Sequence, residues 1–370
     1  MKDFSKALAG FDPQNFDSTR EHNAVRPGGI ARCYNEPMER YGKDWPMGEA
    51  RELEAKKETL PAVEVKNRVI DVNESFPDLP IKLEEGESTR LGMFLTAQKT
   101  EGERSYSLGI EKHHSRSGLW GRILFKDKDG NLYRDIDLKG IGATTGRNGA
   151  IVVDDAPEGY RYTELPHGTK INLGILDLFA AARDKEKSEE LLKLGVRTHR
   201  EIAIIELDEI VDPKGRKISI EEAKRVGLIW PDSKPVIEVR AFGTKARLAD
   251  AAENPLSVED ARLLVAGENN FDPEKFDKKE YAKWLLEATG RNLGLMHKSG
   301  LVHGFMTRHN ITLDGRLVDF DSVRKGSDEE EFQKDIDDAT FALNKFLEAV
   351  GEFSDDEIDF FKKAYDSARK

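Results

Sequence analysis

The strand-forming and helix-forming parts of this chain are separated, and the boundary between them lies near Arg240. Before it, short apolar or alternating runs between turn residues predict strands and one helix. After it, apolar residues recur at helical spacing. The expected strands cover residues 107–110, 119–126, 132–138, 201–207 and 235–240, and the expected helices cover residues 172–195, 276–297, 328–350 and 354–368. This separation predicts an α+β fold rather than alternating βαβ units.

The same boundary divides the chain into three parts. Residues 1–60 are polar and interrupted by proline and glycine, so we expect an extended arm there, with a short helix at residues 51–57. Residues 61–239 are expected to form a strand-rich N-lobe with one main helix. Residues 240–370 are expected to form a helical C-lobe, with a single cleft between the two lobes.

Composition narrows the classes of partner. Asp and Glu number 70 against 58 Lys and Arg, which gives a net charge of −12. General nucleic-acid binding is therefore not expected, because it depends on Lys and Arg contacts to phosphate. No stretch approaches the roughly 20 apolar residues of a membrane helix. Cys33 is the single cysteine, so no intrachain disulfide can form. These features predict a cytoplasmic protein that binds neither nucleic acid nor membrane.

The most informative motif is GLVHGFMTRHNITLDGRLVDFDSV, at residues 300–323. Its turn at Asp314-Gly315 predicts a hairpin that brings Asn310 close to Asp319. In kinase-like enzymes an Asn of the catalytic loop and an Asp after the next short strand hold Mg²⁺. Mg²⁺ prefers such oxygen ligands and keeps several waters, so two side chains and a nucleotide suffice. The alternative is an ordinary hairpin with a surface Asp.

One position in this motif departs from the kinase pattern. Kinases and small-molecule phosphotransferases carry their catalytic Asp two residues after the His, and Phe305 stands there in this chain. A carboxylate base for a substrate hydroxyl is therefore missing at that position. The chain either is inactive or uses a different geometry.

The first half of the chain supplies candidate phosphate-binding residues. Lys139 ends an expected strand and precedes Gly140, and a surface role is the alternative for it. Its acidic partner should lie on the following helix, where Asp184 and Glu189 are five residues apart and so face different ways. Only one of them can point at Lys139. A phosphate-covering turn is also expected at residues 117–121, formed by Ser117, Gly118 and Gly121.

Four segments, taken together, resemble the selenoprotein O family of protein adenylyltransferases, which have a divergent kinase-like fold. DLKGIGAT at residues 137–144 is similar to the family's LKGAGPT, and SEELLKLGVRT at residues 188–198 is similar to SEAMHALGIPT. VRAFGTKARL at residues 239–248 keeps a pair of arginines seven residues apart. HGFMTRHNI at residues 303–311 is similar to HGVMNTDNM. The resemblance covers residues 107–325 and indicates a distant, shorter relative.

This resemblance implies a bilobal, protein-kinase-like fold in which ATP lies inverted, so that AMP is transferred. Lys139 would hold phosphate, Asp184 or Glu189 would orient it, and Asn310 and Asp319 would bind Mg²⁺ or Mn²⁺. Arg240 and Arg247 would clamp the phosphates, since guanidinium forks match phosphate oxygens. Seven residues are about two helical turns, so a helical segment would put both arginines on one face. The alternative for each Arg is a surface ion pair.

The family's proposed base, an Asp before the Asn, is replaced by His309 in this chain. An imidazole could accept a hydroxyl proton near neutral pH, or the replacement could mark lost catalysis. Three hypotheses follow. The first is ATP-dependent adenylylation of hydroxyl side chains on an unidentified protein substrate. The second is a kinase-type phosphotransferase, which Phe305 disfavours. The third is a nucleotide-binding pseudokinase that acts through partner binding.

Overall fold

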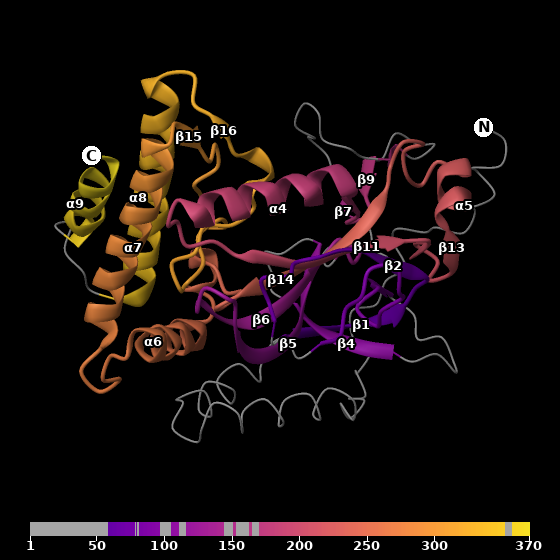
Figure 1. Cartoon of the computed structure of the whole chain (residues 1–370), viewed down its shortest axis with the longest axis horizontal. Coiled ribbons are helices and arrows are strands. Elements are labelled where there is room, and N and C mark those ends of the chain that lie inside the picture. Colours follow the sequence, from indigo (N-terminus) through magenta and orange to yellow (C-terminus); the bar gives the residue numbers. More distant parts are fainter. Residues whose placement is uncertain are drawn as a thin grey trace.

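A large antiparallel sheet forms the centre of the protein (Figure 1). The computed structural model describes residues 58–77, 79, 81–96, 105–110, 116–143, 151–152, 163–164, 170–351 and 357–370. Within these residues nine strands make the sheet, in the order β2-β11-β14-β6-β5-β4-β1-β3, with β10 paired to β14 beside that path. Every strand pair in it is antiparallel. Together with the helices described below, this sheet confirms the predicted α+β class.

The sheet contains both short edge strands and long buried central strands. Its strands are β1 (Glu58–Glu64), β2 (Asn67–Val72), β3 (Met93–Leu95), β4 (Ser105–Ile110), β5 (Ser117–Lys126), β6 (Leu132–Lys139), β10 (Leu176–Asp177), β11 (Arg200–Leu207) and β14 (Pro235–Phe242). Smaller sheets are formed by β7 (Ile151–Val152), β8 (Thr163–Glu164) and β9 (Lys170–Asn172), by β12 (Glu209–Val211) and β13 (Lys217–Ser219), and by β15 (Leu301–Val302) and β16 (Arg324–Lys325). Every residue of β6 and β14 is buried, so charged side chains on these strands need partners inside the protein.

One long helix, α4 (Leu178–Lys193), packs against β11 and β14 of the sheet (Figure 1). It begins later than residue 172, where the sequence predicted its start, because Leu176 and Asp177 pair with β14 as β10. The Asp177 carboxylate then accepts the N–H of Phe179 and caps the helix. The other helices are α5 (Ile220–Arg225), α6 (Pro255–Asn269), α7 (Lys278–Lys298), α8 (Glu329–Val350) and α9 (Ile358–Arg369), with 3₁₀ turns η1 (Leu248–Asp250) and η2 (Phe320–Ser322).

The buried apolar residues fall into two main clusters. One gathers mainly strand residues between Ala62 and Ala241, and the other gathers mainly helical residues between Leu191 and Tyr365. A buried ion network connects the sheet to α6, where Arg134 of β6 donates to both carboxylate oxygens of Asp260 at 2.8 and 2.9 Å. The sheet and the helices are therefore joined by polar contacts as well as by packing.

Helices α7 and α9 approach each other closely through glycine. A methyl group at Gly290 would lie 2.2 Å from the carbonyl oxygen of Phe361, and one at Gly294 would lie 2.6 Å from that of Tyr365. Real side chains do not approach backbone atoms so closely, so these two positions of α7 need glycine. The last helix is thus fitted tightly against α7, and Figure 1 shows the two side by side.

Most expected elements are present, and several were missed. The five predicted strands correspond to β4, β5, β6, β11 and β14, and the predicted helices correspond to α4, α7, α8 and α9. The strands β1, β2 and β3 and the helices α5 and α6 were not predicted. The first 57 residues, which include the expected arm up to that point and its helix at 51–57, lie outside the described residues.

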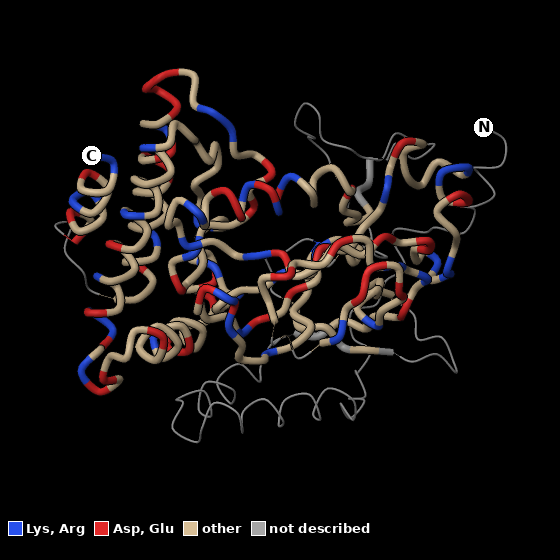
Figure 2. Tube along the Cα trace, viewed as in Figure 1, with Lys and Arg blue, Asp and Glu red and all other residues tan. Residues whose placement is uncertain are grey.

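Charged residues are spread through the described part of the chain. Figure 2 shows Lys and Arg intermixed with Asp and Glu along both the sheet and the helices. No helix among the described residues has the length and apolarity needed to cross a membrane.

Candidate functional site

Lys139 and Asp319 meet although 180 residues separate them. The Lys139 Nζ atom lies 3.0 Å from Oδ1 of Asp319 and 3.1 Å from Oδ2 of Asp184. Lys139 is the last residue of β6, and the chain turns away at Gly140 with φ of +96°. A methyl group at Gly140 would lie 2.4 Å from the carbonyl oxygen of Val236, so glycine is needed there. The residue that the sequence assigned to phosphate and the one that it assigned to metal are therefore in direct contact.

The acidic partner of Lys139 on α4 is Asp184. Both of its carboxylate oxygens are used, since Oδ1 accepts the backbone N–H of Phe320 at 2.7 Å. Glu189 is instead bound by Arg200, whose Nε and Nη2 each donate to it at 2.7 Å. Five residues turn a helix by about one and a half turns, which places Glu189 away from Lys139. The expectation of a single acidic partner therefore resolves to Asp184, and Glu189 does not contact Lys139.

Arg240 and Arg247 both reach Asp319, from different elements. Arg240 lies in β14 and donates to Asp319 Oδ1 at 3.1 Å and to Asp137 at 2.6 Å. Arg247 lies just before η1, with its Nη2 3.9 Å from Asp319 Oδ2. The helical spacing that predicted their convergence is wrong, because the first arginine belongs to a strand. Both guanidinium groups stand over the ring of Phe242, at 5.1 and 5.3 Å from its centroid.

The hairpin after Asn310 is present and brings Asn310 against Val318, the residue before Asp319. Its turn is closed by the Gly315 N–H donating to Thr312, and the Val318 N–H donates to the carbonyl of Asn310 at 3.2 Å. The Asn310 amide donates to the carbonyl of Phe305 at 2.9 Å, and no described residue donates to its Oδ1. Asp319 itself has the left-handed conformation, with φ of +63°, which is rare outside glycine. Its side chain is one-third exposed.

The loop before Asn310 is anchored at its start and exposed at its centre. The carboxylate of Asp335 on α8 accepts the N–H groups of His303 and Gly304, at 2.6 and 2.9 Å. Phe305 is 59% exposed. His309 is partly buried, and its backbone N–H donates to the hydroxyl of Thr307 at 3.3 Å. His309 therefore lies in the loop next to Asn310, as its position in the sequence requires.

The charged side chains at this point keep one another ionised. We call this group, which consists of Lys139, Asp184, Arg240 and Asp319, the ion cluster. Burial acts to lower the pKa of Lys139, but the carboxylates of Asp184 and Asp319 raise it above its ordinary value. Burial acts to raise the pKa of Asp319, but Lys139 and the two arginines hold it well below its usual range. Both partners are therefore ionised at neutral pH.

Glu238 behaves differently from the other acids. It pairs across the strands with Lys139 and is fully buried. Neither of its carboxyl oxygens has a hydrogen-bond partner among the described residues. Burial, followed by the neighbouring charge of Asp184, raises its pKa well above the ordinary value. Glu238 is thus a buried carboxyl whose charged form is disfavoured.

The phosphate-covering turn expected at Ser117, Gly118 and Gly121 is wrong. These residues lie inside β5, where Gly118 pairs with Leu138 and Gly121 with Ile136. A methyl group on Gly118 would touch the side chains of Ile141 and Leu108, at 3.0 and 3.1 Å. Gly118 thus serves packing within the sheet, and neither glycine forms a turn over a phosphate.

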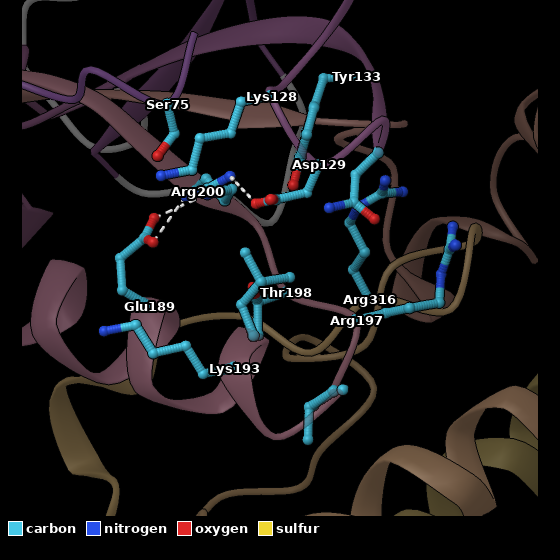
Figure 3. A pocket seen from close by; sticks show the side chains of 14 residues that line it. Ser75, Lys128, Asp129, Tyr133, Glu189, Lys193, Arg197, Thr198, Arg200 and Arg316 are labelled. Atoms are coloured by element: carbon cyan, nitrogen blue, oxygen red, sulfur yellow. Dashed lines mark hydrogen bonds and ion pairs between the residues drawn. The ribbon is translucent and has the colours of Figure 1, made fainter.

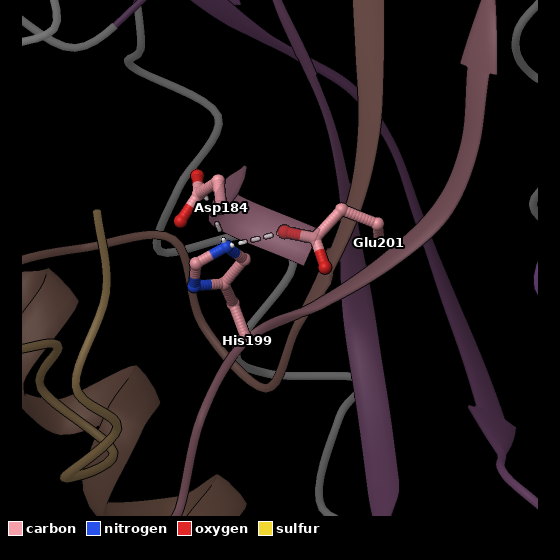
Figure 4. A group of neighbouring side chains, drawn as sticks. All are labelled: Asp184, His199 and Glu201. Atoms are coloured by element: carbon pink, nitrogen blue, oxygen red, sulfur yellow. Dashed lines mark hydrogen bonds and ion pairs between the residues drawn. The ribbon is translucent and has the colours of Figure 1, made fainter. Parts of the chain in front are cut away.

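His199 and Glu201 belong to the site but were not singled out from the sequence. His199 Nε2 lies 2.9 Å from Glu201 and 3.5 Å from Asp184, and all three side chains are buried (Figure 4). These residue types could ligate a metal. Lys139 already contacts the same Asp184 oxygen at 3.1 Å, however, so a metal cation there would meet another positive charge. A charged residue within a buried strand, such as Glu201, was the signal that could have revealed this group.

A separate pocket of about 480 Å³ lies at the C-terminal end of α4, against the turn between β5 and β6 (Figure 3). The three arginines that line it are already paired with acids: Arg200 with Glu189 at 2.7 Å, Arg197 with Glu268 at 2.8 Å, and Arg316 with Asp314. No residue of the ion cluster lines this pocket. Because its arginines are neutralised within the protein, we assign it no ligand.

No protein-family model matches this chain, and no curated protein sequence matches it either. The resemblance to selenoprotein O therefore rests on the four short segments alone.

Proposed function

We propose that this protein binds ATP with Mg²⁺ or Mn²⁺ and transfers AMP to a hydroxyl side chain of another protein. The observation that carries the proposal is the convergence of Lys139, Asp184, Arg240 and Asp319 from four distant segments. Two buried cations held by the partly exposed Asp319 carboxylate are costly to assemble unless they serve a ligand, since buried ion pairs add little net stability. The fold that we propose for this arrangement is bilobal and kinase-like, with ATP inverted.

The side chains fit a metal–nucleotide complex. Asn310 turns its amide nitrogen to Phe305, which leaves Oδ1 as a hard oxygen ligand. Asp319 is one-third exposed and ionised, so it can supply the second ligand. Mg²⁺, when bound, would offset the charge of the phosphates. Lys139, Arg240 and Arg247 would then exchange Asp319 for phosphate oxygens, and these are charge-assisted hydrogen bonds of the strong kind.

The proposed reaction balances without a further co-reactant. The hydroxyl oxygen of the substrate attacks the α-phosphorus of ATP and forms a new P–O bond. The bond between the α-phosphorus and the bridging oxygen breaks, and pyrophosphate leaves with the electron pair. The hydroxyl proton passes to a base, for which His309 is the candidate because it lies next to Asn310.

A second function, nucleotide binding without transfer, is favoured by Phe305. This side chain is apolar and 59% exposed where kinases carry a carboxylate base. The same feature disfavours ordinary phosphotransfer. A pseudokinase with this site would bind ATP and act through a partner protein.

Incubation with Mg²⁺ and ATP labelled on either the α- or the γ-phosphate, together with candidate protein acceptors, separates these functions. Label retained only from the α-phosphate, with release of pyrophosphate, supports adenylylation. Retention from the γ-phosphate supports phosphotransfer, and binding without retention supports the pseudokinase. Lack of ATP binding by the folded protein would refute all three. Asp319→Asn should abolish retention, whereas Asp366→Asn on the exposed face of α9 is the matched control.

A further inference from the structure

His199 occupies the centre of a stack of rings beneath the ion cluster. Its imidazole stacks on both Phe242 and Phe320, with ring centroids 5.3 and 5.1 Å away and interplanar angles of 16° and 7°. Two aromatic side chains therefore stack on this ring. Phe242 carries the two arginines on its own ring, and Phe320 directly follows Asp319.

The edge of the same imidazole is held by two carboxylates. Nε2 lies 2.9 Å from Glu201 and 3.5 Å from Asp184. Glu201 is fixed in turn by the hydroxyl of Ser188 on α4, which donates to it at 2.6 Å. The edge of His199 is thus held by Asp184 from α4 and by Glu201 from β11 (Figure 4).

Asp184, His199 and Phe320, the residue after Asp319, all contact one another. Asp184 contacts the His199 ring and also accepts the Phe320 N–H at 2.7 Å, while the Phe320 ring stacks on His199. Phe320 is therefore held at its backbone and at its side chain by two residues that hold each other. Asp319, just before it, keeps a left-handed conformation that a non-glycine residue adopts only when its surroundings enforce it.

We propose that His199 is a positioning residue, which holds Phe320 against Asp184 and thereby keeps the Asp319 carboxylate turned toward Lys139 and the arginines. The effect of His199 on metal binding rests on the function proposed above. Its restraint of Phe320 is independent of that function. Loss of either the ring stacking or the hydrogen bonds of His199 should loosen Phe320. His199→Phe keeps the stacked ring and loses the hydrogen bonds, and His199→Gln keeps a donor and loses the ring.

The first test is amide hydrogen exchange of the full chain without nucleotide. The Phe320 N–H should exchange on the order of tenfold faster in both variants, because local opening governs its protection. The control is Phe346→Leu, a buried substitution in the helical core, compared at equal thermal stability. If Phe320 is no faster in the His199 variants than in Phe346→Leu, the positioning role is refuted.

The second test separates this role from general damage. Affinity for ADP without metal should stay within about twofold of the parent, whereas Mn²⁺ affinity of the ADP complex, followed by electron paramagnetic resonance, should fall roughly tenfold, within the usual range for residues that support a metal ligand. Unchanged Mn²⁺ affinity would contradict the role of His199 at Asp319. If the parent binds neither ADP nor Mn²⁺, the proposed function fails, and the exchange of Phe320 alone decides whether His199 holds that residue.

Discussion

The Nζ atom of Lys139 lies 3.0 Å from Oδ1 of Asp319, and the Nη1 atom of Arg240 lies 3.1 Å from the same oxygen. One carboxylate oxygen thus contacts two cations that a phosphate could otherwise attract, in addition to the bonds of Lys139 to Asp184 and of Arg240 to Asp137. A phosphate that binds Lys139 and Arg240 must therefore displace Asp319 and supply at least as much negative charge as its carboxylate does. A metal ion that takes over Asp319 would release both cations together, which predicts that nucleotide and metal bind cooperatively.

Asp319→Asn should remove this cooperativity. We expect the enhancement of ATP affinity by Mg²⁺ to fall roughly 10- to 100-fold, because the amide is a weaker ligand and carries no charge. Affinity for ATP without metal should stay the same or rise, since Lys139 and Arg240 lose a competing carboxylate. Calorimetric titration with and without Mg²⁺ measures both quantities. An equal loss under the two conditions would indicate a damaged fold rather than a lost ligand.

Arg240→Ala should destabilise the protein strongly. Arg240 donates to Asp137 at 2.6 Å, and that carboxylate is fully buried. Breaking a buried pair on one side costs roughly 3–5 kcal/mol of unfolding free energy. Urea denaturation should show this loss, whereas Arg225→Ala, which removes an exposed arginine, should cost less than about 1 kcal/mol. Asp137 also pairs with the buried Lys245, so the double variant Arg240→Ala/Asp137→Ala should not recover the parent's stability. Its loss should instead be smaller than the sum of the two single losses, and strict additivity would exclude direct coupling.

His199 should make stability depend on pH. Burial lowers its pKa, but the carboxylates of Asp184 and Glu201 outweigh that effect and raise it to about 9 from the ordinary value of 6.5. A raised pKa means that the folded state binds the proton more tightly. The stabilisation, on the order of 3 kcal/mol, is fully present below pH 6.5 and is lost as pH rises toward 9. The difference in unfolding free energy between the parent and His199→Phe should shrink over that window. A constant difference would show that His199 does not titrate there.

Glu238→Gln should stabilise the protein at neutral and alkaline pH. The pKa of this carboxyl is raised by burial and by Asp184, so its favourable contribution is present below its ordinary pKa of 4.5 and lost as pH rises through the folded value. We expect a gain of roughly 1–2 kcal/mol at pH 8, which disappears near pH 4. Denaturation at both pH values tests this, with Glu206→Gln as the partly exposed control. A loss at pH 8 would mean that Lys139 needs the charge of Glu238.

The sequence predicted the site best where chemistry depends on short motifs. Lys139, Asn310 and Asp319 could be placed because a strand end, a loop and a hairpin turn fix where each side chain emerges. The choice between Asp184 and Glu189 could not be made, since helical spacing shows that they diverge but not which one faces the sheet. Helical spacing was the wrong reason to expect Arg240 and Arg247 together. They meet at one carboxylate because Arg240 lies near the end of a strand and the chain then bends before Arg247.

The buried polar residues beneath the site were harder to predict. Glu201 and Glu238 lie within strands that otherwise read as apolar, and His199 stands at the entry to one of them. Considered one at a time, each of these residues could equally lie on an exposed edge strand of the sheet. Only the pairing of β11 with β14 and of β14 with β6 brings their charges together. A carboxylate in an apolar strand is nevertheless a usable signal, because inside a sheet it needs either a cation or a proton.

The close fit of α9 against Gly290 and Gly294 has a practical consequence for work on this protein. Helix α7 ends at Lys298, and the chain then runs through β15 directly into the loop that carries His303 and Asn310. A truncation that removed residues 357–370 would uncover the glycine face of this helix, and a bulky fusion that pulled α9 away would do the same. The position of this loop could then change although no residue near it had been substituted. Assays of the site are therefore best made with an intact C-terminal helix and with tags placed elsewhere.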